Sequence, residues 1–454
     1  MIDETETIIA LATPPGIGAI SVLRLSGSDS INIVSKVFKG VDLTNQKSHT
    51  VHFGHILDKE TILDEVLATV FVAPHSFTRE NSVELSCHGS MYIVNRILQL
   101  FVQVGARLAD PGEFTKRAYL NGRFDLAQAE AVADLIASEN EASHLTALNQ
   151  MRGGISNEIR ELREKLVHFA SMIELELDFS EEDVEFASRD DLKTLIFAIE
   201  KVLSALIDSF QMGNVIKNGV PVVIVGKPNA GKSTLLNALL KDEKAIVSDI
   251  PGTTRDVIED ELTIGGVKFR FIDTAGLRET ADQVEAIGVE RAEKKMDEAS
   301  LILYLFDLDE ETADHVLEKE AELKNRKTPY LLIGNKSDKA SMDLSTLSQN
   351  QHFISIAAKH GTNLSLLEKR IIELSNLKDF RSGNVIVTNV RHYQSLVQTR
   401  NSLRDVLNGI DLQITNDFLA QDIRHALHHL GEITGEITTD DLLANIFSKF
   451  CIGK

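Results

Sequence analysis

The residues whose spacing points most clearly to chemistry lie between Gly226 and Ser233, where the chain fits the pattern GxxxxGK[ST]. Glycines let a backbone close around a phosphate group, and the free N–H groups at the start of a helix attract anions. In this pattern Lys232 reaches the β- and γ-phosphates of a nucleotide, and Ser233 offers its hydroxyl to Mg²⁺. A chance glycine turn is the alternative, and only further motifs can exclude it.

Two motifs suited to Mg²⁺ and the terminal phosphate follow this loop. Thr253 and Thr254 lie in the sequence Pro-Gly-Thr-Thr-Arg-Asp, which can present a hydroxyl to the metal and the γ-phosphate. Asp273 begins the sequence Asp-Thr-Ala-Gly at the end of an apolar run. Its carboxylate can hold Mg²⁺ through water, and the N–H of Gly276 can sense the γ-phosphate.

Two later motifs are suited to a guanine base. Asp338 ends the sequence Asn-Lys-Ser-Asp, and its carboxylate can accept hydrogen bonds from guanine N1–H and N2, a donor pair that adenine lacks. The sequence Ala-Ala-Lys at 357–359 would complete the pocket. Five motifs in order, each at a strand end, predict a GTP site. The predicted GTP-binding residues are Asn229, Ala230, Gly231, Lys232, Ser233, Thr234, Ser248, Asp249, Ile250, Pro251, Gly252, Thr253, Thr254, Asp273, Thr274, Ala275, Gly276, Asn335, Lys336, Asp338, Ala357, Ala358 and Lys359.

Two details separate this site from that of the signalling GTPases. Leu277 follows Gly276, so the usual water-positioning glutamine is missing. Asn229 lies within the phosphate loop, where its amide oxygen could hold a monovalent cation against the phosphates. Such a cation would supply the positive charge that an arginine gives elsewhere. A turn-forming role is an equally good interpretation of Asn229.

The elements that must position these motifs form an α/β unit over residues 219–378. Apolar runs alternate with helices there, which favours a mostly parallel sheet covered by helices. The expected strands are 222–225, 268–272, 301–306, 330–334 and 353–356.

The rest of the chain is predicted to contain an α+β segment, 1–120, and two helical segments, 121–218 and 379–454. The expected elements of the first segment are strands 19–25, 48–55 and 67–73 and a helix at 90–104. We expect the helical segments to form one domain into which the α/β unit is inserted. The acidic stretch 178–185 could hold a metal, but a solvated helix end or loop explains it better.

The composition is that of a globular protein with about three domains in a reducing compartment. The chain has 454 residues, and Cys87 and Cys451 are its only cysteines, too few for a disulfide framework. No leader or membrane-spanning run stands out, so we expect a cytoplasmic protein with no membrane partner. Because the formal net charge is −21, RNA binding would need a local basic surface or a partner protein.

Five distinctive stretches accompany the GTPase motifs. They are Ala-Thr-Pro-Pro-Gly at 12–16, Pro-Gly-Glu-Phe-Thr-Lys-Arg-Ala at 111–118, Asp-Leu-Ala-Gln-Ala-Glu at 125–130, the run 430–443 and Phe-Cys-Ile-Gly-Lys at 450–454. With these motifs, the chain closely resembles the MnmE (TrmE) family of tRNA-modification GTPases along essentially its whole length. The resemblance implies a homodimer with an N-terminal tetrahydrofolate-binding and dimerisation domain, a helical domain and an inserted Ras-like GTPase domain.

The resemblance also implies a reaction and a partner. The family works with a flavin-containing protein, MnmG (GidA), in a heterotetramer or larger complex. Together they add an aminomethyl or carboxymethylaminomethyl group to carbon five of the wobble uridine of certain tRNAs. The one-carbon unit comes from 5,10-methylene-tetrahydrofolate or a formyl-tetrahydrofolate analogue, and GTP hydrolysis requires K⁺ and Mg²⁺.

Residue by residue, the resemblance implies roles at three kinds of site. The implied ligands are Asn229, Ser248, Ile250 (through its carbonyl) and Thr253 for K⁺, Ser233 and Thr254 for Mg²⁺, and Arg24, Glu84, Arg123 and Lys454 for folate. Glu285 would orient the attacking water indirectly and act in catalysis with Lys232. From the residues alone, Glu285 would be a solvated helix residue, and Arg24 and Arg123 would form surface ion pairs.

Three positions leave alternatives open. Cys451 could take part in chemistry near the folate, act structurally or be a small buried hydrophobe. Arg79 and Ser90 stand where the family commonly has glycine, and they could adjust the loops near the folate site. The competing functions are a regulatory switch, such as a ribosome-assembly GTPase, and a folate enzyme with an added GTPase. The folate-like positions and the C-terminal motif favour tRNA modification.

Overall fold

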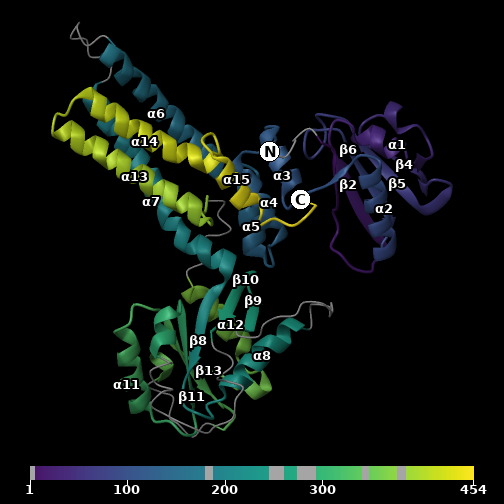
Figure 1. Cartoon of the computed structure of the whole chain (residues 1–454). Helices are drawn as coiled ribbons and strands as arrows, with labels where there is room; N and C mark the ends of the chain where they lie inside the picture. The colour runs from purple at the N-terminus through teal and green to yellow at the C-terminus, as the bar shows by residue number, and fades with distance from the viewer. Residues whose placement is uncertain are drawn as a thin grey trace. The chain divides into compact units, whose positions relative to one another are not determined.

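The computed structural model describes residues 6–178, 188–244, 260–272, 293–339, 347–375 and 385–453. The chain folds as two compact units (Figure 1). The first unit comprises Met1–Ile136, Gln150–Ile199 and Gln398–Lys454, and the second comprises Ala137–Asn149 and Glu200–Val397.

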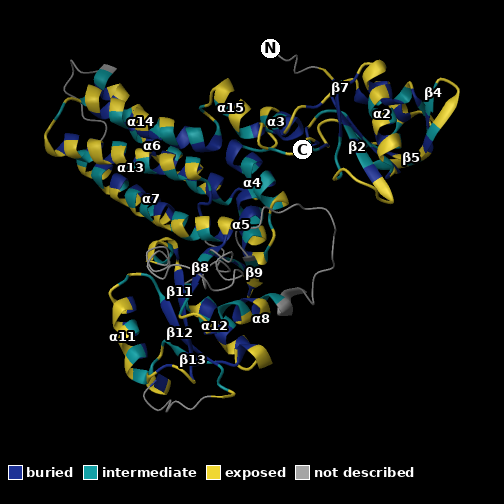
Figure 2. Cartoon of the chain, turned by 60° about the horizontal axis from the view of Figure 1, so that its bottom comes forward, coloured by how far each residue is buried: buried dark blue, intermediate teal, exposed yellow. Residues whose placement is uncertain are grey.

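The first unit contains a seven-stranded sheet with the order β3-β4-β5-β6-β2-β1-β7. Neighbouring strands are antiparallel, except that β1 and β7 are parallel. The strands are β1 Ile8–Leu11, β2 Ile20–Ser26, β3 Phe38–Lys39, β4 Thr50–Asp58, β5 Thr61–Phe71, β6 Ser82–His88 and β7 Arg107–Leu108. From Asp64 onward, the residues of β5 alternate between buried and more exposed (coloured by burial in Figure 2), as expected of a strand with one face on a core.

Helix α2 (Met91–Gln103) packs on this sheet through Val94, Ile97, Leu100 and Phe101, which are all buried. The shorter elements α1 (Ser30–Ser35) and η1 (Leu43–Asn45) complete the same core. The predicted strands at 19–25 and 48–55 and the helix at 90–104 are confirmed. The strand predicted at 67–73 begins earlier, at Thr61, because its first residues pair with the end of β4 across a tight turn.

The first unit also contains helices from distant parts of the chain. They are α3 (Glu113–Leu120), α4 (Leu126–Ile136), α6 (Gly154–Asp178), α14 (Asn416–Thr434) and α15 (Asp440–Phe447). Helix α6 packs along α14, and it buries the apolar side chains of Ile159, Leu162, Leu166 and Ile173 at helical spacing. Helices α7 (Arg189–Asn218) and α13 (Val390–Asp411) each contribute residues to both units.

The second unit is built on a six-stranded sheet with the order β13-β12-β11-β8-β10-β9, parallel except for β9. The strands are β8 Val220–Val225, β9 Asp260–Ile264, β10 Val267–Phe271, β11 Leu301–Asp307, β12 Tyr330–Asn335 and β13 Phe353–Ser355. Every residue of β11 is buried, because a central parallel strand is covered on both faces. The predicted alternation of strands and helices is therefore confirmed.

Helices and short helical turns surround this second sheet. They are α5 (Glu141–Met151), α8 (Lys232–Lys244), α11 (Ala313–Lys324), α12 (Leu364–Leu374), η2 (Leu347–Gln349) and η3 (Ala358–His360). The start of α5 docks on the β9–β10 turn, where the N–H of Ala142 donates to the carbonyl of Gly266 at 3.0 Å. Among the described residues, no helix combines the length and the apolarity needed to cross a bilayer.

Candidate functional site

The glycine-rich loop of the second unit connects strand β8 to helix α8 through backbone that only glycine accommodates. Gly226 has φ +151°, and a Cβ there would lie 1.9 Å from the carbonyl oxygen of Leu305 on neighbouring strand β11. Gly231 has φ +96°, and a Cβ there would lie 2.3 Å from the side-chain nitrogen of Asn335. Both glycines are thus required for close packing, and the loop reaches the first turn of α8 in the predicted strand–turn–helix setting.

The Lys232 side chain folds back on the loop and stabilises it. Its Nζ donates hydrogen bonds to the carbonyl oxygens of Gly226 at 2.7 Å and Lys227 at 2.9 Å. Burial lowers the pKa of this ammonium group. A cation that is partly removed from water and held at the start of a helix attracts a phosphate group strongly.

Asn335 connects three of the predicted motifs. Its Nδ2 donates to the carbonyl oxygen of Ala230 at 2.9 Å, and its Oδ1 accepts from the N–H of Ala358 at 3.1 Å. The side chain is buried, with 3% of its surface exposed. The phosphate loop and the two segments expected around the base are therefore joined by one amide, a role that the sequence motif alone does not reveal.

The segment after β12 contains two of the predicted site residues, Lys336 and Asp338. Lys336 has φ +62°, and its Nζ donates to Asp307 Oδ2 at 2.5 Å, which raises the pKa of Lys336. Asp338 is exposed, and its Oδ2 lies 3.5 Å from Nε2 of His360. An exposed carboxylate at this edge of the sheet can accept hydrogen bonds from a nucleobase. Asp307 is not among the predicted site residues, although an acidic residue at the end of an apolar strand is a recognisable signal.

Several predicted site residues lie outside the described residues. They are Ser248, Asp249, Ile250, Pro251, Gly252, Thr253, Thr254, Asp273, Thr274, Ala275, Gly276, Glu285 and Lys454, together with Leu277 and most of the acidic stretch 178–185. The described residues contain Asn229, with φ +64° and an exposed side chain, and Ser233 in the first turn of α8. In those residues, no three His, Cys, Asp or Glu side chains form a group suited to a metal.

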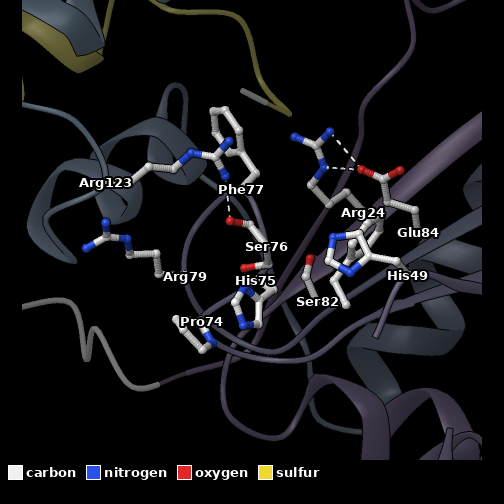
Figure 3. A pocket seen from close by; sticks show the side chains of 11 residues that line it. Arg24, His49, Pro74, His75, Ser76, Phe77, Arg79, Ser82, Glu84 and Arg123 are labelled. Carbon is white, nitrogen blue, oxygen red and sulfur yellow. Dashed lines mark hydrogen bonds and ion pairs between the residues drawn. The ribbon is translucent and has the colours of Figure 1, made fainter. Parts of the chain in front are cut away.

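A pocket of about 490 Å³ in the first unit brings together Arg24, Glu84 and Arg123 (Figure 3). Arg24 on β2 and Glu84 on β6 are direct cross-strand partners, and the Arg24 Nε and Nη2 atoms both lie 2.8 Å from Glu84 Oε1. The Arg24 guanidinium also lies over the rings of Phe77, at 5.4 Å, and Phe114, at 5.7 Å. The pocket wall therefore carries both a planar hydrogen-bond donor, the Arg24 guanidinium, and an acceptor, the Glu84 carboxylate.

Arg123 enters the pocket wall from the loop before α4. Its Nη1 donates to the carbonyl oxygen of Ser76 at 2.5 Å, and its guanidinium lies 5.1 Å from the Phe77 ring centroid and 5.2 Å from that of Phe124. The pKa of Arg123 is lowered, chiefly by desolvation and to a smaller extent by repulsion from Arg79 and Arg24. The pocket is therefore electropositive and suited to an anionic ligand with an aromatic part.

The C-terminal segment lies against the same unit. The N–H of Gly112 donates to the carbonyl oxygen of Cys451 at 3.4 Å, and a Cβ on Gly453 would lie 2.3 Å from the carbonyl oxygen of Leu11. Cys451 is exposed, whereas Cys87 is buried on β6 and its pKa is raised to about 11, chiefly by burial. Because Cys451 is exposed, the interpretation as a small buried hydrophobe is wrong.

The fold and the loop define a phosphate-loop nucleotide-binding protein that carries a second, arginine-lined pocket. Two family models match it, one described as the MnmE helical domain, over residues 126–451, and one as the GTP-binding protein TrmE N-terminus, over residues 7–123. The chain is 58% identical over 453 residues to the tRNA modification GTPase MnmE of Cytophaga hutchinsonii, covering 100% of this chain and 98% of the relative. It is 52% identical over 470 residues to that of Christiangramia forsetii, covering 99% of each. The chain belongs to the MnmE family.

Proposed function

We propose that this chain is a K⁺-dependent GTP hydrolase that acts with an MnmG-type flavoprotein on certain tRNAs. The pair adds an aminomethyl or carboxymethylaminomethyl group to carbon five of the wobble uridine, with methylene-tetrahydrofolate as the one-carbon donor. Family membership makes the chain a tRNA-modification GTPase. The observation that carries the proposal is the presence of two sites in one chain, a phosphate loop and an electropositive pocket.

The contacts around the loop support the GTPase part of the proposal. Lys232 is already held at the loop, where it would neutralise the outer phosphates. Ser233 and Thr254 would hold Mg²⁺, and Asp338 would accept from the guanine edge. Asn229 has a left-handed backbone that presents an exposed amide, which suits a K⁺ ligand.

The remaining proposed K⁺ ligands are Ser248, Ile250 and Thr253. Bound K⁺ supplies positive charge that stabilises the charge developing on the transferred phosphate. Glu285 would orient the attacking water indirectly, replacing the glutamine that this chain lacks.

A comparison of GTP turnover in KCl and in NaCl tests the cation proposal. Wild type should hydrolyse GTP faster in KCl, and Asn229→Ala should remove that difference. Equal wild-type rates in the two salts would contradict it. Glu285→Ala should retain nucleotide binding and lose hydrolysis, whereas lost binding would indicate a structural role.

The pocket of the first unit supports the folate part of the proposal. The Glu84 carboxylate suits the donor edge of a pterin, and the guanidinium groups of Arg24 and Arg123 suit carboxylates of the glutamate moiety. Lys454 would add a further cation, and Cys451 would lie near the folate, with a chemical or a structural role. Methylene-tetrahydrofolate or a formyl analogue would bind there.

An exposed apolar patch on the sheet supports the proposed homodimer. Val51 and Phe53 on β4 and Leu67 on β5 are 57%, 59% and 44% exposed, and Phe53 pairs directly with Leu67. A second copy of the chain would cover this patch, since monomers rarely leave several large apolar side chains together in water. We propose that the segment 1–120 is the dimerisation and folate-binding domain, that 219–378 is the inserted GTPase domain, and that 121–218 and 379–454 form the helical domain.

Nucleoside analysis of tRNA tests the complete reaction. A cytoplasmic enzyme of this kind should restore the modified wobble uridine when its gene is returned to a deletion strain. The matched control is the Lys232→Ala variant, which should leave the uridine unmodified. An unchanged profile in the deletion strain would contradict the enzyme and favour the regulatory switch. The net charge of −21 leaves tRNA binding largely to the MnmG-type partner.

A further inference from the structure

Arg79 has a backbone conformation that an arginine rarely adopts. Its φ is +59°, in the left-handed region that favours glycine. The residues on both sides are anchored. The Thr78 carbonyl accepts from Asn121 Nδ2 at 2.7 Å, and Glu80 pairs with the buried Arg117 at 3.3 Å. Because the contacts of its neighbours anchor the backbone, Arg79 is kept in this left-handed conformation, and such strain concentrates at ligand-binding positions.

Arg79 and Arg123 join the two loops that form this wall. Arg79 Nη1 donates to the carbonyl oxygen of Asn121 at 3.0 Å, while Arg123 Nη1 donates to the carbonyl oxygen of Ser76. Each arginine thus reaches from its own loop to the backbone of the other. Both side chains line the pocket (Figure 3).

The charge of this wall is only partly compensated. Arg24 has a carboxylate partner, Glu84, whereas the contacts recorded for Arg79 and Arg123 within the described residues are with carbonyl oxygens and aromatic rings. A guanidinium has five N–H donors in a planar fork, so each of these two can bind a carboxylate while keeping its carbonyl contact. The wall therefore provides two carboxylate-binding forks on adjacent loops.

We propose that Arg79 is a specificity residue that binds an additional carboxylate of a polyglutamylated folate. This inference rests on the proposed folate function and deepens it. Folate with one glutamate carries two carboxylates, and each further γ-linked glutamate adds one more. Arg123 binds the carboxylates of the first glutamate, and Arg79 binds one that only longer tails supply. The chain therefore prefers polyglutamylated over monoglutamylated reduced folate.

Calorimetric titration of the full chain with 5-formyl-tetrahydrofolate, as the monoglutamate and as the triglutamate, tests this inference. Wild type should bind the triglutamate on the order of 10-fold more tightly, the effect of one charge-assisted contact. Arg79→Gly accommodates the left-handed backbone and should reduce this ratio to about one, while monoglutamate affinity changes less than about twofold. Lys59→Gly is the matched control, because Lys59 also has a left-handed φ of +57° but does not line the pocket, and it should keep the wild-type ratio.

The outcomes separate this inference from the function on which it rests. If wild type bound neither folate, the proposed folate function would itself be wrong. If Arg79→Gly kept the triglutamate preference, or weakened both folates equally, the role of Arg79 would be refuted while folate binding stood. An unchanged preference with weaker tRNA binding would also refute it and would assign Arg79 to the nucleic acid.

Discussion

The phosphate loop and the arginine-lined pocket are both suited to anions, but they differ in the groups that make them so. The loop uses backbone shape, since Gly226 and Gly231 admit no side chain, and Lys232 supplies positive charge at the start of α8. The pocket uses side chains, since its guanidinium groups come from residues 24, 79 and 123 on separate elements. A backbone-made site is contiguous in sequence, whereas a side-chain-made site exists only after the sheet and its loops have assembled.

The largest predicted effect concerns Lys232 in the loop. Lys232→Ala should weaken GTP binding on the order of 100-fold, because it removes a charge-assisted contact to the phosphates. Fluorescence titration with a labelled GTP analogue measures this loss. Lys319→Ala, which removes an exposed lysine paired with Glu322 on α11, should bind like wild type. A comparable loss of GTP affinity in Lys319→Ala would show a general effect of net charge, and the loop would then not bind phosphate through its own lysine.

A smaller effect is expected at the base. Asp338→Asn replaces a carboxylate, which accepts two hydrogen bonds, by an amide that can also donate one. Such an amide is a better partner for xanthine than for guanine. The variant should prefer xanthosine triphosphate over GTP by roughly 10-fold or more, as measured by competition for the labelled nucleotide. Retained preference for GTP would show that the guanine edge is read elsewhere.

The pocket should respond more weakly to a single change, because several side chains share its charge. Glu84→Gln keeps the shape but removes the charge beside Arg24, and we expect about 10-fold weaker binding of 5-formyl-tetrahydrofolate. GTP turnover should stay within about twofold of wild type. Glu65→Gln is the control, because Glu65 is an exposed carboxylate on β5 of the same sheet. A parallel fall in GTP turnover would show that the two sites are coupled.

The smallest effect is a pH dependence that the pocket should not share. Burial lowers the pKa of Lys232 from its ordinary value of 10.5, and bound phosphates raise it again by favouring the charged form. GTP affinity is therefore complete below the pKa of the free protein and falls as the pH rises through it. Titrations across the alkaline range should show this fall in wild type and a flatter profile in Lys232→Arg. Identical profiles would remove Lys232 as the cause.

The sequence predicts five of the six strands of the second sheet, because five apolar runs alternate with helices. It does not predict the antiparallel edge strand β9. It also predicts the residues of the phosphate loop, because they form one contiguous motif. It does not predict that Asn335 joins the loop to Ala358, since residues 335 and 230 are more than one hundred positions apart and meet only through the parallel pairing of β8, β11 and β12.

The pocket shows a different limit. Arg24, Glu84 and Arg123 are indicated by the family resemblance, and no local pattern places them together. Their proximity follows from the β2–β6 register and from the packing of Phe77 between two guanidinium groups. Arg79 is noticed in the sequence only as a departure from the family, because a left-handed backbone cannot be inferred from a residue type that disfavours it.

The two cysteines differ enough in environment to give the chain a built-in labelling position. Cys87 is 2% exposed and its pKa is about 11, whereas Cys451 is exposed. Since thiol reagents react with accessible thiolates, a maleimide dye at neutral pH should modify Cys451 alone. Gly453, two residues after Cys451, packs against Leu11 on β1, next to the strand that carries Arg24. A fluorophore there would report on the surroundings of the C-terminal segment without any engineered cysteine.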